Sequence, residues 1–402
     1  MKKVYIAAYH QSKFGKLMGL SVPEIVGSAI RGVCGEIGAD PAVVDVGSIG
    51  SACNFTLNEQ GLLAGLMAMV PGLESKPIET VENACASGGQ AILSVTQKLL
   101  LGMGEVGIAM GYEKMRDAVG KMDGKLIGKV LGFFSHPDER GGKVFVFPHI
   151  FAEVMAAYMK EHQVGEKELA QIAVIEYRNA RHNPYAQMRN VQLTLEQALR
   201  IEGINRYVVD GLPLKTYDCS QITDGYAALI LATEEGLRKL GVAKEDSVEI
   251  AGWAQATDPL KKAGRDILKP AGAHSAMRRA YEMAGVDAKD VNVAEVHDCF
   301  TVMGAIGAEV VGKASYGKGA HYWVEGKALR DGECAINTSG GLIAKGHPIG
   351  ATGIAMVGWC AWQLLGKVPA ELQVFDPRVA ATFNIGGPIC ASVCTVLKRA
   401  IR

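Results

Sequence analysis

A cysteine in a run of small residues is the first candidate for chemistry in this sequence. Cys85 lies in residues 83–89 (NACASGG), after a predicted strand and just before a predicted helix. At the N-terminus of a helix, free N–H groups and the helix dipole stabilise a thiolate, and small neighbours let a ligand approach. Cys85 is therefore a candidate nucleophile. The alternative is a buried, inert cysteine, which is the more common fate of a thiol.

A histidine in a glycine-rich run could supply the base for that nucleophile. His347 lies within residues 339–353 (SGGLIAKGHPIGATG). Glycine leaves room for a ligand or an unusual backbone path, and an imidazole beside a cysteine can take its proton near neutral pH. A solvated loop histidine is the alternative.

Two further runs end predicted strands, where α/β proteins gather functional groups. Residues 297–300 (HDCF) could supply a hydrogen-bond donor from His297 and a titrating thiol from Cys299. Residues 384–387 (NIGG) could offer backbone N–H groups as an oxyanion hole. Taken alone, the first signal is weak, and a tight turn explains the second.

Alternating strand and helix patterns predict an α/β fold with a largely parallel, buried sheet. Strands are expected at 4–9, 46–49, 77–81, 106–111 and 227–232, with helices at 21–37, 87–101 and 234–240. A second run has strands at 248–252, 293–296, 333–337, 373–376, 380–384 and 389–398, and helices at 274–284, 300–311 and 350–365. Residues 112–220 break the alternation and are interpreted as an inserted lid, with helices at 150–161 and 166–183.

The two runs resemble each other, which indicates a duplicated unit. Residues 38–49 align without gaps onto 285–296, and 88–102 pair with 352–366. Under this overlay Cys85 falls near His347, and His297 falls opposite Gly50, so we expect the motifs to converge between the halves. The predicted units are 1–111 and 221–246 for the N-terminal half, 112–220 for the insert and 247–402 for the C-terminal half. The alternative is that helix–glycine–strand joints look alike in any α/β chain.

The composition excludes several classes of protein. Lysine plus arginine and aspartate plus glutamate both number 42, and 49% of residues are apolar, so neither disorder nor binding to nucleic acid or an anionic membrane is expected. The nine cysteines include no C-x-x-C pair, so we expect no metal site. The N-terminus lacks a signal-peptide pattern, and the longest apolar stretch (353–366) is too short to span a bilayer. We therefore expect a cytoplasmic protein with reduced thiols and no membrane partner.

Together, the runs NACASG (83–88), GHPIGATG (346–353) and HDCF (297–300) resemble those of the thiolase family. The likeness covers nearly the whole chain, and HDCF, like RHNP (181–184) in the insert, is similar to the sterol-carrier-protein-2-type and archaeal-type thiolases. It implies the thiolase fold, in which two similar βαβ-rich halves form a five-layer α-β-α-β-α body with an inserted loop domain. Common thiolases carry a second catalytic cysteine where this chain has Asn384, and an asparagine where it has His297.

The resemblance implies a role for each candidate residue. Cys85 attacks the 3-keto carbon of a 3-oxoacyl-CoA and becomes acylated, His347 takes its proton, and Cys299 protonates the enolate in place of the missing cysteine. His297 and His347 bind the enolate oxygen, and the backbone N–H groups of Cys85 and Gly386 bind the tetrahedral oxyanion. Coenzyme A is a cosubstrate, and no covalent, metal or redox cofactor is implied. A thiol acid and base of this kind is expected to need a lowered pKa.

The substrate and partners stay open at this point. Five of the ten phenylalanines (133, 134, 145, 147 and 151) lie close together in the insert, which borders the acyl site in thiolases. Acetoacetyl-CoA and a bulkier or aromatic substrate such as benzoylsuccinyl-CoA are both open, while a small core for the insert is the alternative role of these rings. The resemblance also implies a homodimer or dimer of dimers, and a small partner subunit with a zinc ribbon and an OB-fold. A decarboxylating, ketoacyl-synthase-like condensing enzyme and a non-catalytic scaffold that binds acyl-CoA or lipid are the rival functions.

Overall fold

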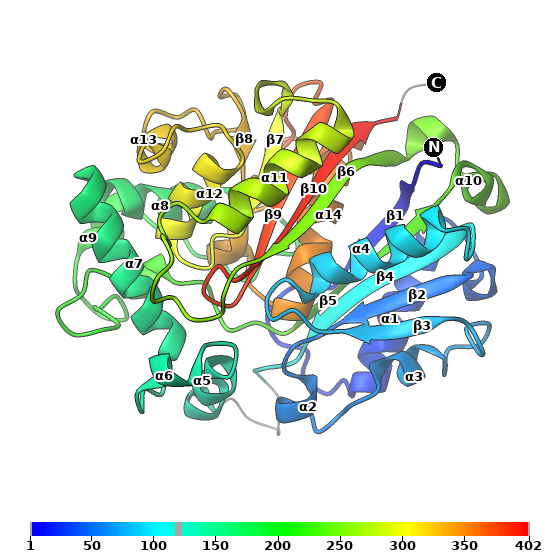
Figure 1. Cartoon of the computed structure of the whole chain (residues 1–402), viewed down its shortest axis with the longest axis horizontal. Helices are drawn as coiled ribbons and strands as arrows, with labels where there is room; N and C mark the ends of the chain where they lie inside the picture. Colours follow the sequence, from blue (N-terminus) through cyan, green and yellow to red (C-terminus); the bar gives the residue numbers. More distant parts are fainter. Residues whose placement is uncertain (1, 117–122, 401–402) are drawn as a thin grey trace.

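Two half-sheets with the same strand order form the body of the protein (Figure 1). The structure, a computed structural model, describes residues 2–116 and 123–400. The N-terminal half-sheet has the order β3-β2-β4-β5-β1 and consists of β1 (Tyr5–Gln11), β2 (Val46–Gly50), β3 (Ile78–Val81), β4 (Val106–Glu113) and β5 (Gly225–Ala232). The C-terminal half-sheet has the order β8-β7-β9-β10-β6 and consists of β6 (Val248–Thr257), β7 (Val293–Val296), β8 (Ala335–Ile336), β9 (Val379–Gly386) and β10 (Ala391–Arg399). The strand order thus repeats, as a duplication predicts.

Hydrogen bonds join the half-sheets along one short seam. Tyr5 of β1 pairs with Glu249 of β6, and Ile6 pairs with Val248, so the described strands form one ten-stranded sheet. β2 pairs in parallel with β3 and β4, and β7 does so with β8 and β9, but the other neighbouring strands are antiparallel. The expectation of a largely parallel sheet is therefore wrong. A link as short as the one between β9 and β10 allows only antiparallel pairing.

Helices lie outside and between the half-sheets in five layers. The middle layer holds α4 (Ser87–Leu100) and α14 (Ile349–Leu365), which contact strands of both halves. On the outer face of the N-terminal half lie α1 (Val22–Gly35) and α3 (Leu63–Met67), and on that of the C-terminal half lie α11 (Ala271–Ala284) and α12 (Thr301–Val310). This α-β-α-β-α order is the five-layer fold that the sequence predicts.

The two middle helices approach each other closely at their N-termini. A Cβ atom on Gly88 would lie only 2.7 Å from the carbonyl oxygen of Gly350, so a larger residue at 88 would push the helices apart. Farther along, Ile92 and Val95 of α4 and Ile354 of α14 share one buried apolar cluster. Burying such side chains stabilises the fold by roughly 1.5–3 kcal/mol each. This packing brings the two helix N-termini, and the loops that precede them, to one place.

The described chain between β4 and β5 contains five α-helices and packs mainly on the C-terminal half. It contains α5 (Gly124–Gly132), α6 (Pro137–Arg140), α7 (Val146–His162), α8 (Glu166–His182) and α9 (Leu195–Leu199). Phe151 of α7 is buried and stacks on Phe300 at a centroid distance of 4.7 Å, next to the HDCF run. Phe133 and Phe145 are 45% and 46% exposed, so the five clustered rings do not form one core of the insert.

Three other short α-helices lie in the described residues: α2 (Asn54–Leu57), α10 (Glu234–Leu240) and α13 (Gly319–Val324). Four 3₁₀-helices and a π-helix at Gly341–Lys345 are also present there. Among residues 2–116 and 123–400, every helix is too short or too polar to cross a membrane.

The strand expected at 373–376 is absent, because a side chain takes the backbone partners that a strand would supply. Oε1 of Gln363 accepts a hydrogen bond from the N–H of Val374 (3.0 Å), and its Nε2 donates one to the carbonyl oxygen of Leu372 (2.7 Å). Phe375 projects outward and is 96% exposed. Backbone groups paired in this way do not need a sheet neighbour.

Candidate active site

Cys85 lies on a sharp turn between β3 and α4. Ala84 adopts a left-handed conformation (φ 48°), which costs an alanine about 1–2 kcal/mol. The Ser87 hydroxyl holds this turn, because its oxygen accepts from the N–H of Asn83 (2.8 Å) and donates to the carbonyl of Ala84 (2.6 Å). The turn leaves the Cys85 sulfur at the start of α4, where the sequence predicts it.

Three of the four predicted side chains meet. The Cys85 sulfur and one ring nitrogen each of His297 and His347 all lie within 4.8 Å of one another. They come from the turn before α4, the end of β7 and the loop before α14. The two imidazole rings stand edge to face, with their centroids 4.9 Å apart and an interplanar angle of 87°. The motifs thus converge between the halves.

His347 is held as a base that faces the site. Its Nδ1 lies 2.7 Å from the Thr352 hydroxyl, which itself donates to the carbonyl oxygen of Pro348 (3.1 Å). Since the single hydroxyl proton is used there, Thr352 must accept from the N–H at Nδ1. Nε2 of the neutral imidazole then carries a lone pair that can take a proton. The backbone N–H of His347 donates to Thr223 (2.9 Å), which fixes the loop.

Burial keeps this cysteine–histidine pair neutral. Loss of solvation, with a smaller effect from the carboxylates of Glu113 and Glu82, raises the pKa of the Cys85 thiol to about 12. Burial, aided by the charge of Lys345, lowers the pKa of His347 to about 3. Desolvation thus outweighs the stabilisation of a thiolate by the helix N-terminus. A neutral thiol of this kind suits a nucleophile that gives up its proton as it attacks.

Cys299 lies beside the three-residue cluster but outside it. The side chain is buried, and burial, with a contribution from the nearby Cys85, raises the pKa of its thiol well above the usual range. The carbonyl oxygen of Cys299 accepts a hydrogen bond from the N–H of Ser220 (2.9 Å), which joins the HDCF run to the end of the insert. The direction of this shift is opposite to the lowered pKa that an acid and base of this kind was expected to need.

The predicted oxyanion donor Gly386 is next in sequence to Gly387, whose backbone N–H is the group that approaches the Cys85 sulfur. The backbone N–H groups of Gly387 and of Cys85 itself are directed at Sγ of Cys85. Gly387 has φ 62°, a left-handed conformation that glycine adopts without strain. The structure therefore adds Gly387 to the donors that the sequence proposes.

Sequence reasoning missed the residues that position the site. Nδ2 of Asn384 lies 3.0 Å from Nδ1 of His297 and 3.0 Å from the carbonyl oxygen of Cys85. Glu113 accepts from the N–H of Gly350 (2.9 Å) and thereby ties β4 to the start of α14. Burial raises the pKa of Glu113 to about 7. Asn384 did carry a signal, as a departure from the thiolase pattern, whereas a glutamate at the end of a strand carried none.

Apolar side chains from the insert wall the site on one side. Cys85 packs against a buried cluster formed by α2, α5 and the start of α14. The members contributed by the segment from α5 onward are Leu126, Ile127, Val130, Leu131 and Phe134. A wall of this kind suits the acyl part of a substrate better than a charged group.

The same three atoms also have the spacing of a metal site. Cysteine and histidine are the ligands that zinc prefers, and Cys85, His297 and His347 are close enough to share an ion. The expectation of no metal rests on the spacing of cysteines along the sequence. That spacing cannot reveal a cluster whose members come from three distant segments.

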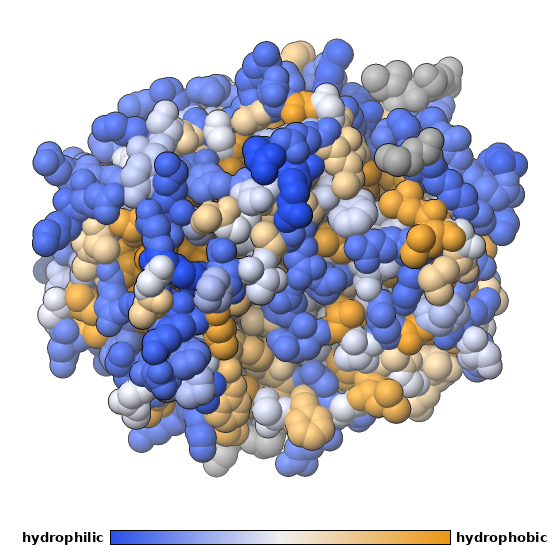
Figure 2. Space-filling view, in the orientation of Figure 1, coloured by the Kyte–Doolittle hydropathy of each residue, from blue (hydrophilic) through white to orange (hydrophobic). Residues whose placement is uncertain are grey.

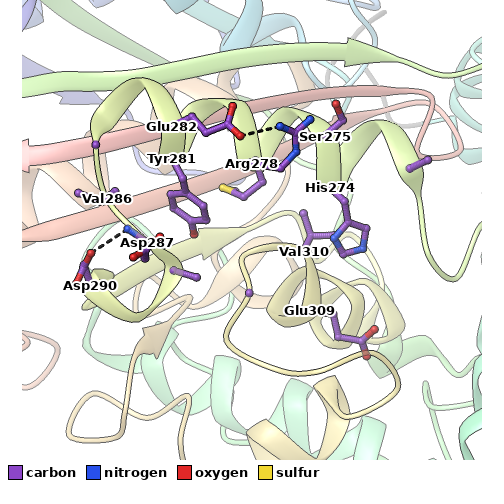
Figure 3. Close-up of a pocket in the computed structure, with 15 residues that line it drawn as sticks. His274, Ser275, Arg278, Tyr281, Glu282, Val286, Asp287, Asp290, Glu309 and Val310 are labelled. Atoms are coloured by element: carbon purple, nitrogen blue, oxygen red, sulfur yellow. Dashed lines mark hydrogen bonds and ion pairs between the residues drawn. The ribbon is translucent and has the colours of Figure 1, made fainter.

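A separate groove of about 910 Å³ runs along α11 and the end of α12 (Figure 3). None of the four predicted residues lines it. Arg278 is paired there with Glu282 (2.7 Å), and the Tyr281 hydroxyl donates to the carbonyl of Val311 (2.8 Å). Since the predicted residues lie elsewhere, the groove is not the candidate active site.

Comparison with known proteins agrees with this geometry. Residues 4–235 match the family description "Thiolase, N-terminal domain", and residues 254–399 match "Thiolase C-terminal domain-like". An acetyl-CoA acetyltransferase of Methanothermobacter thermautotrophicus is 32% identical over 96% of this chain and 97% of its own. The benzoylsuccinyl-CoA thiolase subunit BbsB of Thauera aromatica is 29% identical over 96% and 95%.

A solved structure has the same fold. A chain of the Ltp2-ChsH2(DUF35) aldolase superposes with a TM-score of 0.82 over 100% of this chain and 98% of its own, at 20% identity. The family matches together span most of the sequence, and the cysteine and the two histidines of the family motifs meet where the two halves join. The chain therefore belongs to the thiolase family of acyltransferases.

Proposed function

We propose that this protein is a thiolase that cleaves a 3-oxoacyl-CoA with coenzyme A, or catalyses the reverse Claisen condensation, through an acyl-enzyme on Cys85. The observation that carries the proposal is the meeting of Cys85, His297 and His347 within 4.8 Å at the junction of the halves. A nucleophile, a base and a further hydrogen-bond donor are the groups that thioester chemistry needs.

In the first step, Nε2 of His347 takes the Cys85 proton while the sulfur attacks the 3-keto carbon. The N–H groups of Cys85 and Gly387 lie beside this sulfur, and Gly386 adjoins them. Donors directed at a developing oxyanion contribute about 3–4 kcal/mol each to transition-state stabilisation. Since attack makes a negative oxygen, the donors offset the cost of separating charge in a buried site.

In the second step, the bond between C2 and C3 breaks and leaves a thioester enolate. His297 and His347 donate to its oxygen, and Cys299 gives its proton to C2, which releases the shortened acyl-CoA. Coenzyme A then attacks the acyl group on Cys85, its thiol proton passes to the Cys299 thiolate, and the leaving Cys85 sulfur regains a proton from His347. A buried thiol with a raised pKa holds its proton until the enolate forms, which suits an acid in this step.

The apolar wall supports an uncharged acyl group next to Cys85. Acetoacetyl-CoA and a bulkier or aromatic 3-oxoacyl-CoA, of which benzoylsuccinyl-CoA is the named example, are the two substrate classes. The ring of Phe134 borders the apolar cluster beside Cys85, whereas Phe151 is fully buried against Phe300. An aromatic side chain beside Cys85 suits the larger class, and acetoacetyl-CoA stays an equal contender.

The proposal includes a second copy of the chain. β3 ends the strand order, so one of its edges is free among the described residues. Near it, Phe55, Leu62 and Met69 are 75%, 80% and 69% exposed, and Figure 2 shows apolar side chains over α2 and α3. An open edge beside apolar side chains is suited to pairing with a partner.

A small second subunit is also proposed, of the zinc-ribbon and OB-fold kind. One relative is named as a thiolase subunit, and the solved neighbour is named together with ChsH2(DUF35).

All nine cysteines are free thiols, which supports a reducing, cytoplasmic location.

The test is to incubate the protein and coenzyme A with 3-oxoacyl-CoAs from acetoacetyl-CoA to benzoylsuccinyl-CoA. Intact-protein mass spectrometry reports the acyl adduct, and chromatography reports cleavage. The wild type should gain the acyl mass, and Cys85→Ala should gain none. An adduct on Cys85→Ala would contradict the assigned nucleophile. Condensation that requires decarboxylation of a malonyl-type donor would favour the ketoacyl-synthase-like alternative, and binding without an adduct would favour the scaffold.

A further inference from the structure

Asn384 is a buried side chain at the end of β9 that contacts two parts of the site at once. Its Nδ2 lies 3.0 Å from the carbonyl oxygen of Cys85 and 3.0 Å from Nδ1 of His297. A carbonyl oxygen can only accept a hydrogen bond, so the amide nitrogen must face Cys85. The opposite amide orientation would place two acceptors against each other. The backbone of the nucleophile therefore fixes which way Asn384 points.

This orientation decides where His297 carries its proton. The second hydrogen on Nδ2 of Asn384 is directed at Nδ1 of His297, which must then accept. A neutral imidazole has one N–H, so the proton of His297 resides on Nε2. Nε2 is buried, and the described residues offer it no hydrogen-bond partner. A buried donor without a partner needs an explanation, and a ligand oxygen would provide one.

Burial supports the neutral state of this ring. Loss of solvation, together with the neighbouring His347, holds the pKa of His297 well below its usual range. His347 has the opposite tautomer, with its proton on Nδ1 facing Thr352. Two histidines whose rings lie 4.9 Å apart thus offer one bare nitrogen and one N–H to the same space.

We propose that Asn384 is a positioning residue that holds the proton of His297 on Nε2, and so makes His297 a hydrogen-bond donor to the thioester enolate oxygen. The role in catalysis rests on the proposed thiolase function, but the tautomer does not. Asn384 stands where common thiolases carry a second catalytic cysteine. In this chain the residue at that position acts on the reaction indirectly, through His297. A metal at Nε2 would have to displace this proton, so the tautomer disfavours zinc binding by Cys85, His297 and His347.

The tautomer can be measured directly by long-range ¹H–¹⁵N correlation NMR on protein labelled with ¹⁵N-histidine. The His297 signals are assigned by their loss in His297→Asn, which places the family's common residue there. Wild-type His297 should show a protonated Nε2 and a bare Nδ1. Asn384→Asp presents only acceptors, so it should move the proton to Nδ1 or add a second one. A wild-type His297 protonated on Nδ1 would overturn the proposal, and this measurement does not depend on whether Asn384→Asp folds.

Two reactions separate positioning from a general loss of structure. Cleavage of a 3-oxoacyl-CoA passes through the enolate, whereas acyl exchange between an acyl-CoA and dephospho-CoA runs through the acyl-enzyme on Cys85 and forms no enolate. Asn384→Asp should lower kcat for cleavage by about 10²–10³-fold, the usual effect of removing one such donor, and lower exchange less than tenfold. Asn384→Ala, which leaves the proton free to occupy either nitrogen, should fall between Asn384→Asp and wild type.

The outcomes distinguish this proposal from the proposed function. Equal losses of cleavage and exchange with an unchanged tautomer would overturn the positioning role while leaving the thiolase activity in place. Absence of both reactions in wild type, with the expected tautomer, would contradict the thiolase proposal alone. Retention of one zinc ion per wild-type chain, removed by Cys85→Ala, would overturn the protonated Nε2.

Discussion

Cys85 and His347 lie together as a neutral thiol and a neutral imidazole, because burial raises the pKa of one to about 12 and lowers that of the other to about 3. An ion pair formed before substrate binds would need both shifts reversed. Cys85 and His347 are thus arranged to exchange a proton only when substrate binds and forms an oxyanion that the neighbouring N–H donors stabilise.

Alkylation of Cys85 should therefore depend steeply on pH. The thiolate is the reacting species, and its fraction rises about tenfold per pH unit below the thiol pKa. The rate of labelling by iodoacetamide, measured by peptide mass spectrometry, should climb without a plateau from pH 7 to pH 9. A plateau above pH 7 would instead indicate a pre-formed thiolate paired with an imidazolium. Protection by acyl-CoA identifies the labelled thiol as the one in the site.

Cys299 should be required for carbon–carbon bond chemistry but not for alkylation of Cys85. Replacing it in Cys299→Ala removes the proton donor to the enolate, and the cavity left is small. Cleavage of a 3-oxoacyl-CoA should fall by at least about 10²-fold, the usual contribution of a positioned acid. Alkylation of Cys85 by iodoacetamide, followed by peptide mass spectrometry, should persist in this variant. Undiminished cleavage would show that another group protonates the enolate.

At the scale of elements, helix α8 of the inserted segment is joined to the catalytic loops by a buried acid pair. Glu176 of α8 accepts from Nδ2 of Asn337 (2.9 Å) and shares a hydrogen bond with Asp298. Asp298 in turn accepts from the N–H groups of Leu342 (2.8 Å) and Ile343 (3.1 Å) in the turn that leads to His347. The proton shared by Glu176 and Asp298 therefore helps to fix three segments relative to one another: the HDCF run, the loop before α14 and the insert.

Replacing Glu176 by glutamine should flatten the pH dependence of stability. Burial, with the charge of Asp298, raises the pKa of Glu176 well above its usual range, so the folded state keeps a proton that the unfolded chain releases above about pH 4.5. The free energy of unfolding then falls as pH rises through that window, by about 1.4 kcal/mol per pH unit for one proton. Glu176→Gln keeps a donor towards Asp298 but removes this linkage.

Urea unfolding at pH 5.5, 6.5 and 7.5 measures the effect. The wild type should lose stability more steeply with rising pH than Glu176→Gln does. The exposed Glu196 of α9 provides the matched control, since Glu196→Gln should keep the wild-type slope. Equal slopes for wild type and Glu176→Gln would show that the pair is ionised in the folded protein.

Sequence patterns predicted the elements well where a period or a motif was strong. The repeat of 38–49 in 285–296 corresponds to β2 and β7, which take the same place in their half-sheets. The same patterns could not give the role of Asn384, because this role depends on a hydrogen bond to Cys85, which lies 299 positions earlier in the chain. Residues 373–376 have strand-like composition, yet Gln363 decides their conformation from a neighbouring helix. Periodicity can be recognised in a short stretch of sequence. A hydrogen bond between residues far apart in the chain cannot.

At the scale of the whole molecule, duplication creates the site. Each half ends its third strand with a loop that leads into a middle-layer helix, and those helices meet through Gly88 and Gly350. Cys85 comes from one such loop and His347 from the other. The nucleophile and its base thus lie in equivalent loops of the two copies of the duplicated unit. The HDCF run and the NIGG run, both from the C-terminal half, then supply the groups that a single unit lacks.

The whole chain should form a dimer through the edge at β3, and charge placed there should break it. Phe55→Asp with Leu62→Asp puts two carboxylates on the exposed apolar side chains beside this edge. Leu62 has φ 47°, which aspartate tolerates better than leucine, so the fold should not suffer. Light scattering after size exclusion should give twice the mass of one chain for wild type and a single chain for the double variant. Phe375→Asp, at another highly exposed apolar residue outside α2, α3 and β3, should leave the dimer intact. A monomeric wild type, or a dimer that survives both charges, would place the interface elsewhere or remove it.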